Sequence, residues 1–228
     1  MTNLRINLWP GTVVPIPPVV RADVTLSEDL QIVLIGGSLP TVELPEEFVL
    51  RQLLDLNVQP HRGADMNTDV LLDFVATYGV PLIERCSSAE VERLAEGVRI
   101  LQDLVRLWVS LVELPDDADL DPADVELLAQ RLNEGLRELH PSATLDGRTP
   151  AVDLRAACHL QLHNLMVEVA EGVPLRRCQN ERCGRAFLRQ YDVAARTKHR
   201  VKGLRFCSLR CARNQAKREF HRRQRESI

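Results

Sequence analysis

Four of the six cysteines in this chain lie close together in the sequence, as two pairs. Four residues separate Cys178 from Cys183, three separate Cys207 from Cys211, and 23 residues lie between the pairs. Two such pairs suit a tetrahedral ion, because each pair supplies one edge of the tetrahedron, and zinc prefers thiolates where no redox chemistry is needed. We therefore predict one structural Zn²⁺ bound by these four thiolates.

Two disulfides are the alternative use of the same cysteines. No charged segment followed by an unbroken apolar stretch occurs in the first thirty residues, since prolines interrupt each apolar run (Pro10, Pro15, Pro17 and Pro18). We therefore expect a cytoplasmic protein without a membrane span, in which thiols stay reduced. A module this small and polar also needs a metal to fold, which favours zinc over disulfides or a redox role.

The residues beside the cysteines predict how each pair is held. Gly184 directly follows the first pair, which is typical of a knuckle turn whose backbone N–H groups point at sulfur. Ser208 is a good helix N-cap, so Cys207 and Cys211 would lie at a helix start, where the positive end of the helix dipole favours thiolate. A knuckle paired with a helix N-terminus is a treble-clef arrangement. Nearby arginines can balance the charge of four thiolates on one ion: Arg176, Arg177, Arg182, Arg185 and Arg205.

A strongly basic helix is predicted to follow the last cysteine. We expect one narrow apolar stripe to hold this helix, with charge elsewhere on its surface; the stripe is formed by Leu209, Ala212, Ala216 and Phe220. The cations around this stripe exceed what solubility or the helix dipole requires, and their density suits contacts with phosphates. The predicted nucleic-acid contacts are Arg210, Arg213, Lys217, Arg218, Arg222, Arg223 and Arg225, with Arg200 and Lys202 from the preceding loop.

The charge of the chain is divided in the same way. Residues 1–175 contain 12 Lys and Arg against 28 Asp and Glu, whereas residues 176–228 contain 17 against 4. A concentrated positive field attracts polyanions by releasing their counterions, and an acidic body repels them. This division predicts two modules with different partners.

The C-terminal residues resemble the CGNR zinc-finger family of bacterial transcription regulators. The shared pattern is a Cys-x-Asn-x-x-Cys knuckle with an aromatic residue four positions on (Cys178, Asn180, Cys183 and Phe187), followed by Arg205-Phe206-Cys207-Ser208 and by Cys211 with its basic helix. The resemblance is specific over residues 174–225, although Ala212-Arg213-Asn214 stands where the family has Gly-Asn-Arg. It implies a structural zinc and DNA binding. Residues 71–77 also weakly resemble the stress-induced regulator domain that precedes this finger.

The rest of the chain predicts an α+β, mainly helical body over residues 1–173, with the finger over 174–228. Short alternating segments in residues 1–44 (residues 4–8, 22–26 and 31–35) predict a small sheet, and residues 87–172 predict a helical bundle. The first bundle helix would start at a capping box, residues 87–90, the second at the N-cap Asp121 with Pro122, and the third near residues 149–150. Gly172 would end the third helix.

Few side chains of the body suggest chemistry. His159 and His163 have the i,i+4 spacing of metal ligands but lack the acidic third ligand of metalloproteases, so a structural role is favoured. Cys86 and Cys158 are isolated and suit small buried positions. The acidic run over residues 113–121 does not match a calcium loop. A nuclease built on the finger would have only His199, His221 and Asp192 for a second ion, so we do not predict an enzyme.

These inferences combine into a zinc-dependent nucleic-acid-binding protein, a DNA-binding transcription regulator whose partner is duplex DNA. The alternative is a protein-interaction adaptor whose basic finger binds an acidic partner, including the acidic body of a second copy. The helical body is also a candidate surface for homo-oligomer formation.

Overall fold

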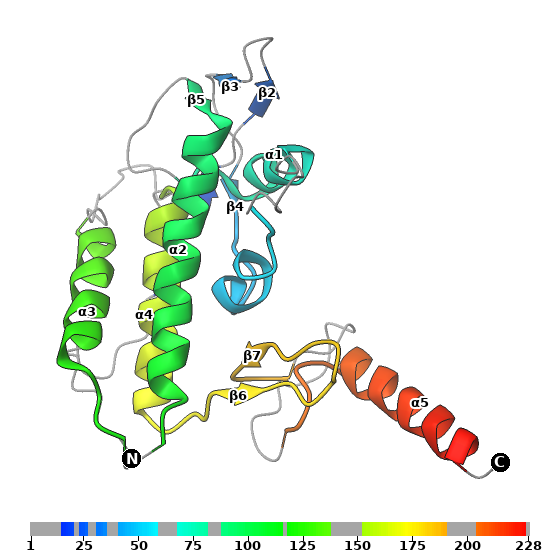
Figure 1. Ribbon diagram of the computed structural model, residues 1–228. Helices are drawn as coiled ribbons and strands as arrows, with labels where there is room; N and C mark the ends of the chain where they lie inside the picture. Colours follow the sequence, from blue (N-terminus) through cyan, green and yellow to red (C-terminus); the bar gives the residue numbers. More distant parts are fainter. Residues whose placement is uncertain are drawn as a thin grey trace. The chain divides into compact units, whose positions relative to one another are not determined.

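A computed structural model of the chain describes residues 15–20, 23–26, 31–35, 41–58, 68–81, 88–115, 118–137, 152–190 and 204–226. The described part is mainly helical, with six helices and three small antiparallel sheets (Figure 1). The chain divides into two compact units, Met1–Val167 and Glu168–Ile228. The predicted boundary at residue 173 stays a prediction.

Short strands form the N-terminal part of the first unit. In one sheet, β1 (Val19–Val20) pairs with β4 (Thr41–Val42). In the other, β3 (Gln31–Ile35) lies between β2 (Asp23–Leu26) and β5 (Ser88–Glu90). The predicted strands near residues 22–26 and 31–35 are therefore present, whereas the one at residues 4–8 lies outside the described residues.

The longest helix, α2 (Val91–Val112), buries the apolar face that its sequence predicts. Its side chains from Val91 to Leu111 on that face are at most 6% exposed. The predicted capping box at its start is wrong. Residues 88–90 form strand β5 instead, and Glu90 at the N-cap makes no side-chain capping bond. Pairing with β3 occupies the backbone that a capping box would use, so the helix begins only after the strand.

The other two bundle helices begin and end at polar or glycine signals. In α3 (Pro122–Leu136), the Asp121 carboxylate accepts the Ala123 N–H at 2.9 Å, which confirms the predicted N-cap. In α4 (Leu154–Ala170), the cap is Asp153, which accepts the Ala156 N–H at 2.7 Å. Gly172 has φ +95° just beyond α4, which is the left-handed conformation that ends helices.

Two buried glutamines join these helices to the one-turn π-helix η1 (Val49–Leu53). Gln161 of α4 accepts the Val49 N–H at 2.9 Å and donates to the Pro45 carbonyl at 3.0 Å. Gln102 of α2 donates to the carbonyls of Leu53 and Leu56, at 2.8 and 2.7 Å. Both amides satisfy backbone groups that would otherwise be buried without partners. Their polar side chains therefore belong to the packing of the body.

The remaining helix of the body, α1 (Thr68–Tyr78), covers residues 71–77, the segment that resembles the regulator domain. It buries Leu71, Phe74 and Val75. The Phe74 and Tyr78 rings lie 5.9 and 4.7 Å from the ring of Phe48, measured between centroids. This aromatic group extends the core beyond the three bundle helices.

His159 and Cys158 of α4 are buried in the body and have structural roles. His159 is 2% exposed, and its Nδ1 hydrogen-bonds with the Arg155 carbonyl oxygen at 2.8 Å. Burial lowers the pKa of His159 and raises the pKa of the Cys158 thiol, so both side chains are neutral near pH 7. Within the part of the chain that the structure describes, neither His159 nor His163 belongs to a group of three or more potential metal ligands.

Gly135 of α3 allows the close approach of His159. A Cβ atom added at residue 135 would collide with the imidazole ring. Alanine is the better helix former by about 1 kcal/mol, but overpacking a buried contact costs about 1–3 kcal/mol. We expect Gly135→Ala to lower the free energy of unfolding, measured by urea denaturation, by about 1 kcal/mol. In a His159→Ala background the same change should be neutral or stabilising. An equal loss in both backgrounds would show that the ring is not the obstacle.

Among the described residues, no helix combines the length and the apolar character that a membrane span requires.

Candidate metal centre

A short hairpin in the second unit carries the first half of the candidate metal site. Strands β6 (Arg176–Arg177) and β7 (Ala186–Phe187) pair antiparallel, and the turn between them carries the first two cysteines. We call residues 178–184 the knuckle. The Cys178 N–H donates to the Arg185 carbonyl at 2.9 Å, and the Cys183 N–H donates to the Asn180 carbonyl at 2.7 Å. Gly184 has φ +58°, which closes the knuckle in a conformation that glycine adopts without strain.

The other two cysteines lie at the start of the C-terminal helix α5 (Leu209–Glu226). The Ser208 hydroxyl accepts the Cys211 N–H at 3.2 Å, as the predicted N-cap requires. Cys207 precedes the cap, and Cys211 lies in the first turn. Both thiols therefore stand where the helix dipole favours negative charge.

The structure brings the four sulfur atoms together. The Sγ atoms of Cys178, Cys183, Cys207 and Cys211 all lie within 4.8 Å of one another, and this group could hold one metal ion. The Sγ atoms of Cys183 and Cys207 are 3.8 Å apart, and those of Cys207 and Cys211 are 3.6 Å apart. A tetrahedral ion with Zn–S bonds of about 2.3 Å requires S–S edges of about 3.8 Å. The spacing of this four-cysteine cluster therefore fits a tetrahedral metal centre.

The electrostatics of the four-cysteine cluster call for a cation. Burial raises the pKa of the Cys183 and Cys207 thiols, and charge on the neighbouring sulfur atoms raises both further. At Cys211 burial acts in the same direction, but hydrogen bonds from Ser208 and from neighbouring cysteines outweigh it and lower the pKa. Without a cation, four thiolates this close would repel one another. A divalent ion removes that penalty, and its binding releases protons.

A small apolar cluster surrounds the sulfur atoms. Phe187 is fully buried against Cys178 and Cys207, and Leu204 and Phe206 pack against the same group. Phe187 is the aromatic residue of the knuckle motif. These side chains exclude water from one side of the cluster, but they form too small a core to stabilise a unit of this size by themselves.

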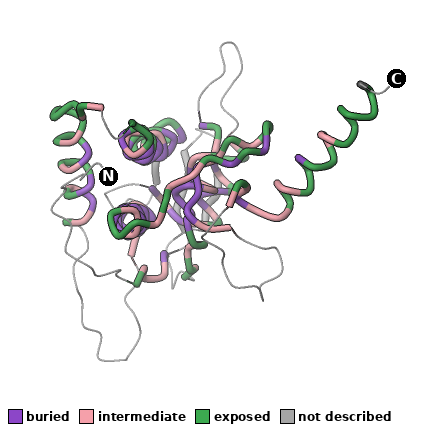
Figure 2. Tube along the Cα trace, turned by 90° about the horizontal axis from the view of Figure 1, so that it is seen from below, coloured by how far each residue is buried: buried purple, intermediate pink, exposed green. Residues whose placement is uncertain are grey.

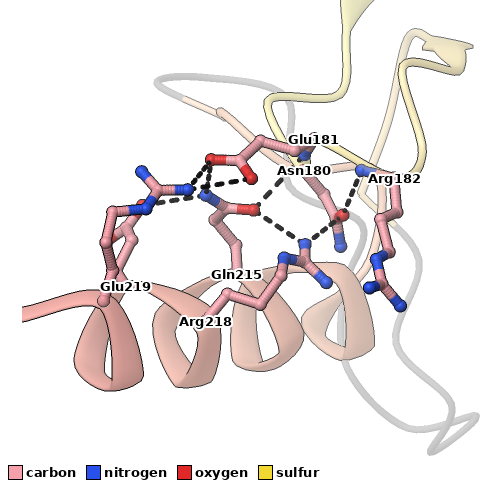
Figure 3. Close-up of polar contacts among 7 residues, drawn as sticks. Asn180, Glu181, Arg182, Gln215, Arg218 and Glu219 are labelled. Atoms are coloured by element: carbon pink, nitrogen blue, oxygen red, sulfur yellow. Dashed lines mark hydrogen bonds and ion pairs between the residues drawn. The ribbon is translucent and has the colours of Figure 1, made fainter. Parts of the chain in front are cut away.

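A polar network joins the knuckle to α5 (Figure 3). Asn180, only 4% exposed, donates to the Cys211 carbonyl at 3.0 Å and accepts from the Arg182 N–H at 3.0 Å and from the Arg218 guanidinium. Gln215 donates to the Glu181 carboxylate at 3.0 Å and accepts the Glu181 N–H at 3.3 Å. The knuckle therefore holds α5 through side chains as well as through any shared ion.

Two arginines that the sequence assigned to nucleic acid take part in this network. Arg222 donates to both carboxylate oxygens of Glu181, at 2.9 and 3.1 Å, and the hydrogen bonds from Arg222 and Gln215 hold the pKa of Glu181 below its ordinary value. Arg218 also donates to Gln215, at 2.7 Å. Both side chains therefore have a structural use, whatever else they contact.

The predicted apolar stripe of α5 is wrong as the packing face. Leu209 and Ala212 are half-buried, Ala216 is exposed, and Phe220 is 57% exposed. Within residues 209–225 only Gln215 is buried. Figure 2 shows that most of α5, the helix leading to the C-terminus, is exposed or half-buried. The reason is geometric, because Cys211 must face the cluster, and residues one, two and three turns further on the same side then face the knuckle. Those residues are polar: Gln215, Arg218 and Arg222.

The other predicted nucleic-acid contacts of α5 lie on its exposed surface. Arg210, Arg213, Lys217 and Arg225 are exposed and have no hydrogen-bond or ion-pair partner among the described residues. Arg223 is also exposed but has an interaction within the chain. Arg200 and Lys202 lie outside the described residues.

The arginines near the sulfur atoms serve the local structure. Arg176 donates to the Leu204 carbonyl at 3.3 Å, and Arg177 donates to the Gly184 carbonyl at 3.1 Å. Arg205 donates to the Gln179 side chain at 2.5 Å, and its guanidinium lies 5.9 Å from the centre of the Phe206 ring. These contacts agree with the expectation that part of the positive charge here is structural.

The loss of Asn180, a buried residue that joins the knuckle to α5, should weaken metal binding without removing a ligand. Asn180→Ala removes the side-chain donor to the Cys211 carbonyl and one acceptor of the Arg218 guanidinium, which keeps its bond to Gln215. Groups that orient metal ligands are worth about 10–100-fold in affinity. We expect a loss of that size in zinc affinity, measured by competition with a chromophoric chelator. The matched control is Gln179→Ala, an exposed neighbour in the same knuckle, which should change the affinity little. Equal affinities for the two variants would contradict this role of Asn180.

The chain was compared with known proteins, and no family model, curated protein or solved structure matches it.

Proposed function

We propose that the four-cysteine cluster binds one structural zinc ion and that the second unit is a treble-clef-like zinc finger. The observation that carries the metal site is the close approach of four Sγ atoms from two elements, the knuckle and the first turn of α5. Four thiolates fill a tetrahedral shell and leave no open position for water, which is typical of structural rather than catalytic zinc. The ion would therefore fix the direction in which α5 leaves the knuckle.

We further propose that this finger binds duplex DNA and that the protein is a transcription regulator. Support comes from four exposed cations of α5, Arg210, Arg213, Lys217 and Arg225, which have no hydrogen-bond or ion-pair partner among the described residues. They stand on the helix that carries Cys211 of the cluster. Exposed Arg and Lys at this density suit phosphate oxygens. The resemblance of the knuckle and helix to the CGNR zinc fingers supports DNA over other polyanions.

A salt titration of DNA binding tests this function. The zinc-loaded full chain is titrated with a fluorescent mixed-sequence duplex at several salt concentrations. Neutralising about six phosphates gives a slope of about −5 in a plot of log affinity against log salt. Chelation of the zinc should remove this binding. No binding to duplex at low salt, or binding unaffected by chelation, would contradict the proposal.

The same titration distinguishes DNA binding from the alternative, a protein-interaction adaptor. If α5 instead binds an acidic protein partner, including the acidic body of a second copy, duplex DNA will bind weakly or not at all. The purified chain will then self-associate at low salt and dissociate as salt is added, because such contacts are screened. Sedimentation of the full chain over the same salt range measures this outcome.

A further inference from the structure

Phe220 is the most exposed large apolar side chain among the described residues, at 57%. Single exposed apolar residues are common on protein surfaces, so exposure alone needs no explanation. Phe220 differs from most exposed apolar residues in the charge that surrounds it. It stands on a helix with seven Lys and Arg, near the middle of the most basic stretch of the chain. The side of α5 on which Phe220 lies determines which groups the phenyl ring can contact.

Helix geometry places Phe220 with two exposed cations. Lys217 precedes it by three residues and Arg213 by seven, which puts all three side chains on one side of α5. At 3.6 residues per turn, these residues are rotated roughly 140–160° from Gln215, the residue that packs on the knuckle. We call Arg213, Lys217 and Phe220 the outer face of α5. The metal-anchored side and the outer face are therefore nearly opposite.

We propose that the outer face of α5 enters the DNA major groove and that Phe220 contacts the methyl groups of thymines there. The proposal rests on the proposed DNA-binding function. A helix of 18 residues is about 27 Å long, and the major groove is wide enough to admit it. Arg213 and Lys217, both N-terminal to the ring on this face, supply phosphate contacts beside it.

Thymine is the base that a phenyl ring can recognise in this groove. Its C5-methyl group is the apolar feature among the hydrogen-bonding groups on the base edges. Stacking the ring on an unpaired base would instead require opening the duplex, which costs a few kcal/mol and needs a device to hold the base out. The charge of α5 selects a polyanion, and the exposed phenyl ring of Phe220 selects an apolar feature on it. Duplex DNA offers both.

The test compares two duplexes that differ only in those methyl groups. One is a mixed-sequence duplex, and the other is the same duplex with uracil in place of every thymine. We expect the zinc-loaded full chain to bind the thymine duplex about fourfold more tightly, the factor that corresponds to burying one methyl group. Phe220→Ala should bind both duplexes equally, and Phe220→Leu should keep a preference for thymine.

Further measurements keep this test specific. Phe220 is exposed, so Phe220→Ala should keep the zinc content and melting temperature of the parent chain. Its salt slope should also be unchanged, because a phenyl ring neutralises no phosphate. If the parent chain binds no duplex at all, the proposed function fails. If it binds with a steep salt slope but without a thymine preference, or if Phe220→Ala weakens both duplexes equally, only the thymine contact is wrong.

Discussion

Replacing Cys207 with serine is expected to abolish metal binding and to unfold the second unit. The Cys207 Sγ lies 3.8 Å from that of Cys183 and 3.6 Å from that of Cys211, so one substitution breaks the contact between the knuckle and the helix start. A structural zinc contributes on the order of 10 kcal/mol to the folding of such modules. We therefore expect zinc content to fall from about one per chain to near zero. Helix content should decrease as α5 unfolds.

The matched control for this change is Cys158→Ala. Cys158 is a buried cysteine of α4 that belongs to the body. Its loss should cost stability in the body while the zinc content stays at one per chain. Atomic absorption gives the metal content and circular dichroism gives the helix content of each variant. A Cys207→Ser chain that kept its zinc and its helix content would contradict the role of the four-cysteine cluster.

Reversing the charge of two outer-face residues is expected to have the largest effect on DNA binding. Arg213→Glu with Lys217→Glu removes two exposed cations and adds two charges that phosphates repel. We expect duplex affinity to fall on the order of 100-fold at low salt, and the log-log salt slope to change from about −5 to about −3. Neither side chain has a partner among the described residues, so the zinc content should not change.

The control for net charge is the double variant Arg99→Glu with Arg106→Glu. It makes the same change in net charge, but on α2, where Arg99 and Arg106 pair only with Glu96 and Asp103 among the ion pairs described. This variant should keep the salt slope of the parent chain. If both double variants weakened DNA binding equally, net charge rather than α5 would explain the affinity.

Local signals in the sequence predicted much of this structure. The apolar face of α2, the Asp121 cap of α3 and the Gly172 end of α4 all depend on neighbouring residues in one helix. The cysteine spacing likewise predicted which four sulfur atoms come together. Each of these features follows from the helical period of apolar residues, from helix capping or from the spacing of metal ligands. These signals involve residues that are close together in the sequence.

Features that depend on distant partners were missed. Residues 88–90 pair with β3, more than fifty residues earlier in the chain, and no local signal separates this strand from a capping box. The packing side of α5 was assigned to the apolar stripe, because apolar residues usually face inward. Cys211 offered a better signal. A residue that must face a metal fixes the side of its helix, and that side continues to Gln215 and Arg218.

The central claim is that four thiolates bind one zinc ion that anchors α5. X-ray absorption at the zinc edge, together with the metal content of the purified full chain, tests it most directly. The claim predicts one zinc per chain with four sulfur neighbours at about 2.3 Å and no nitrogen or oxygen ligand. A chain without stoichiometric zinc, or a zinc shell that contains oxygen or nitrogen, would contradict it.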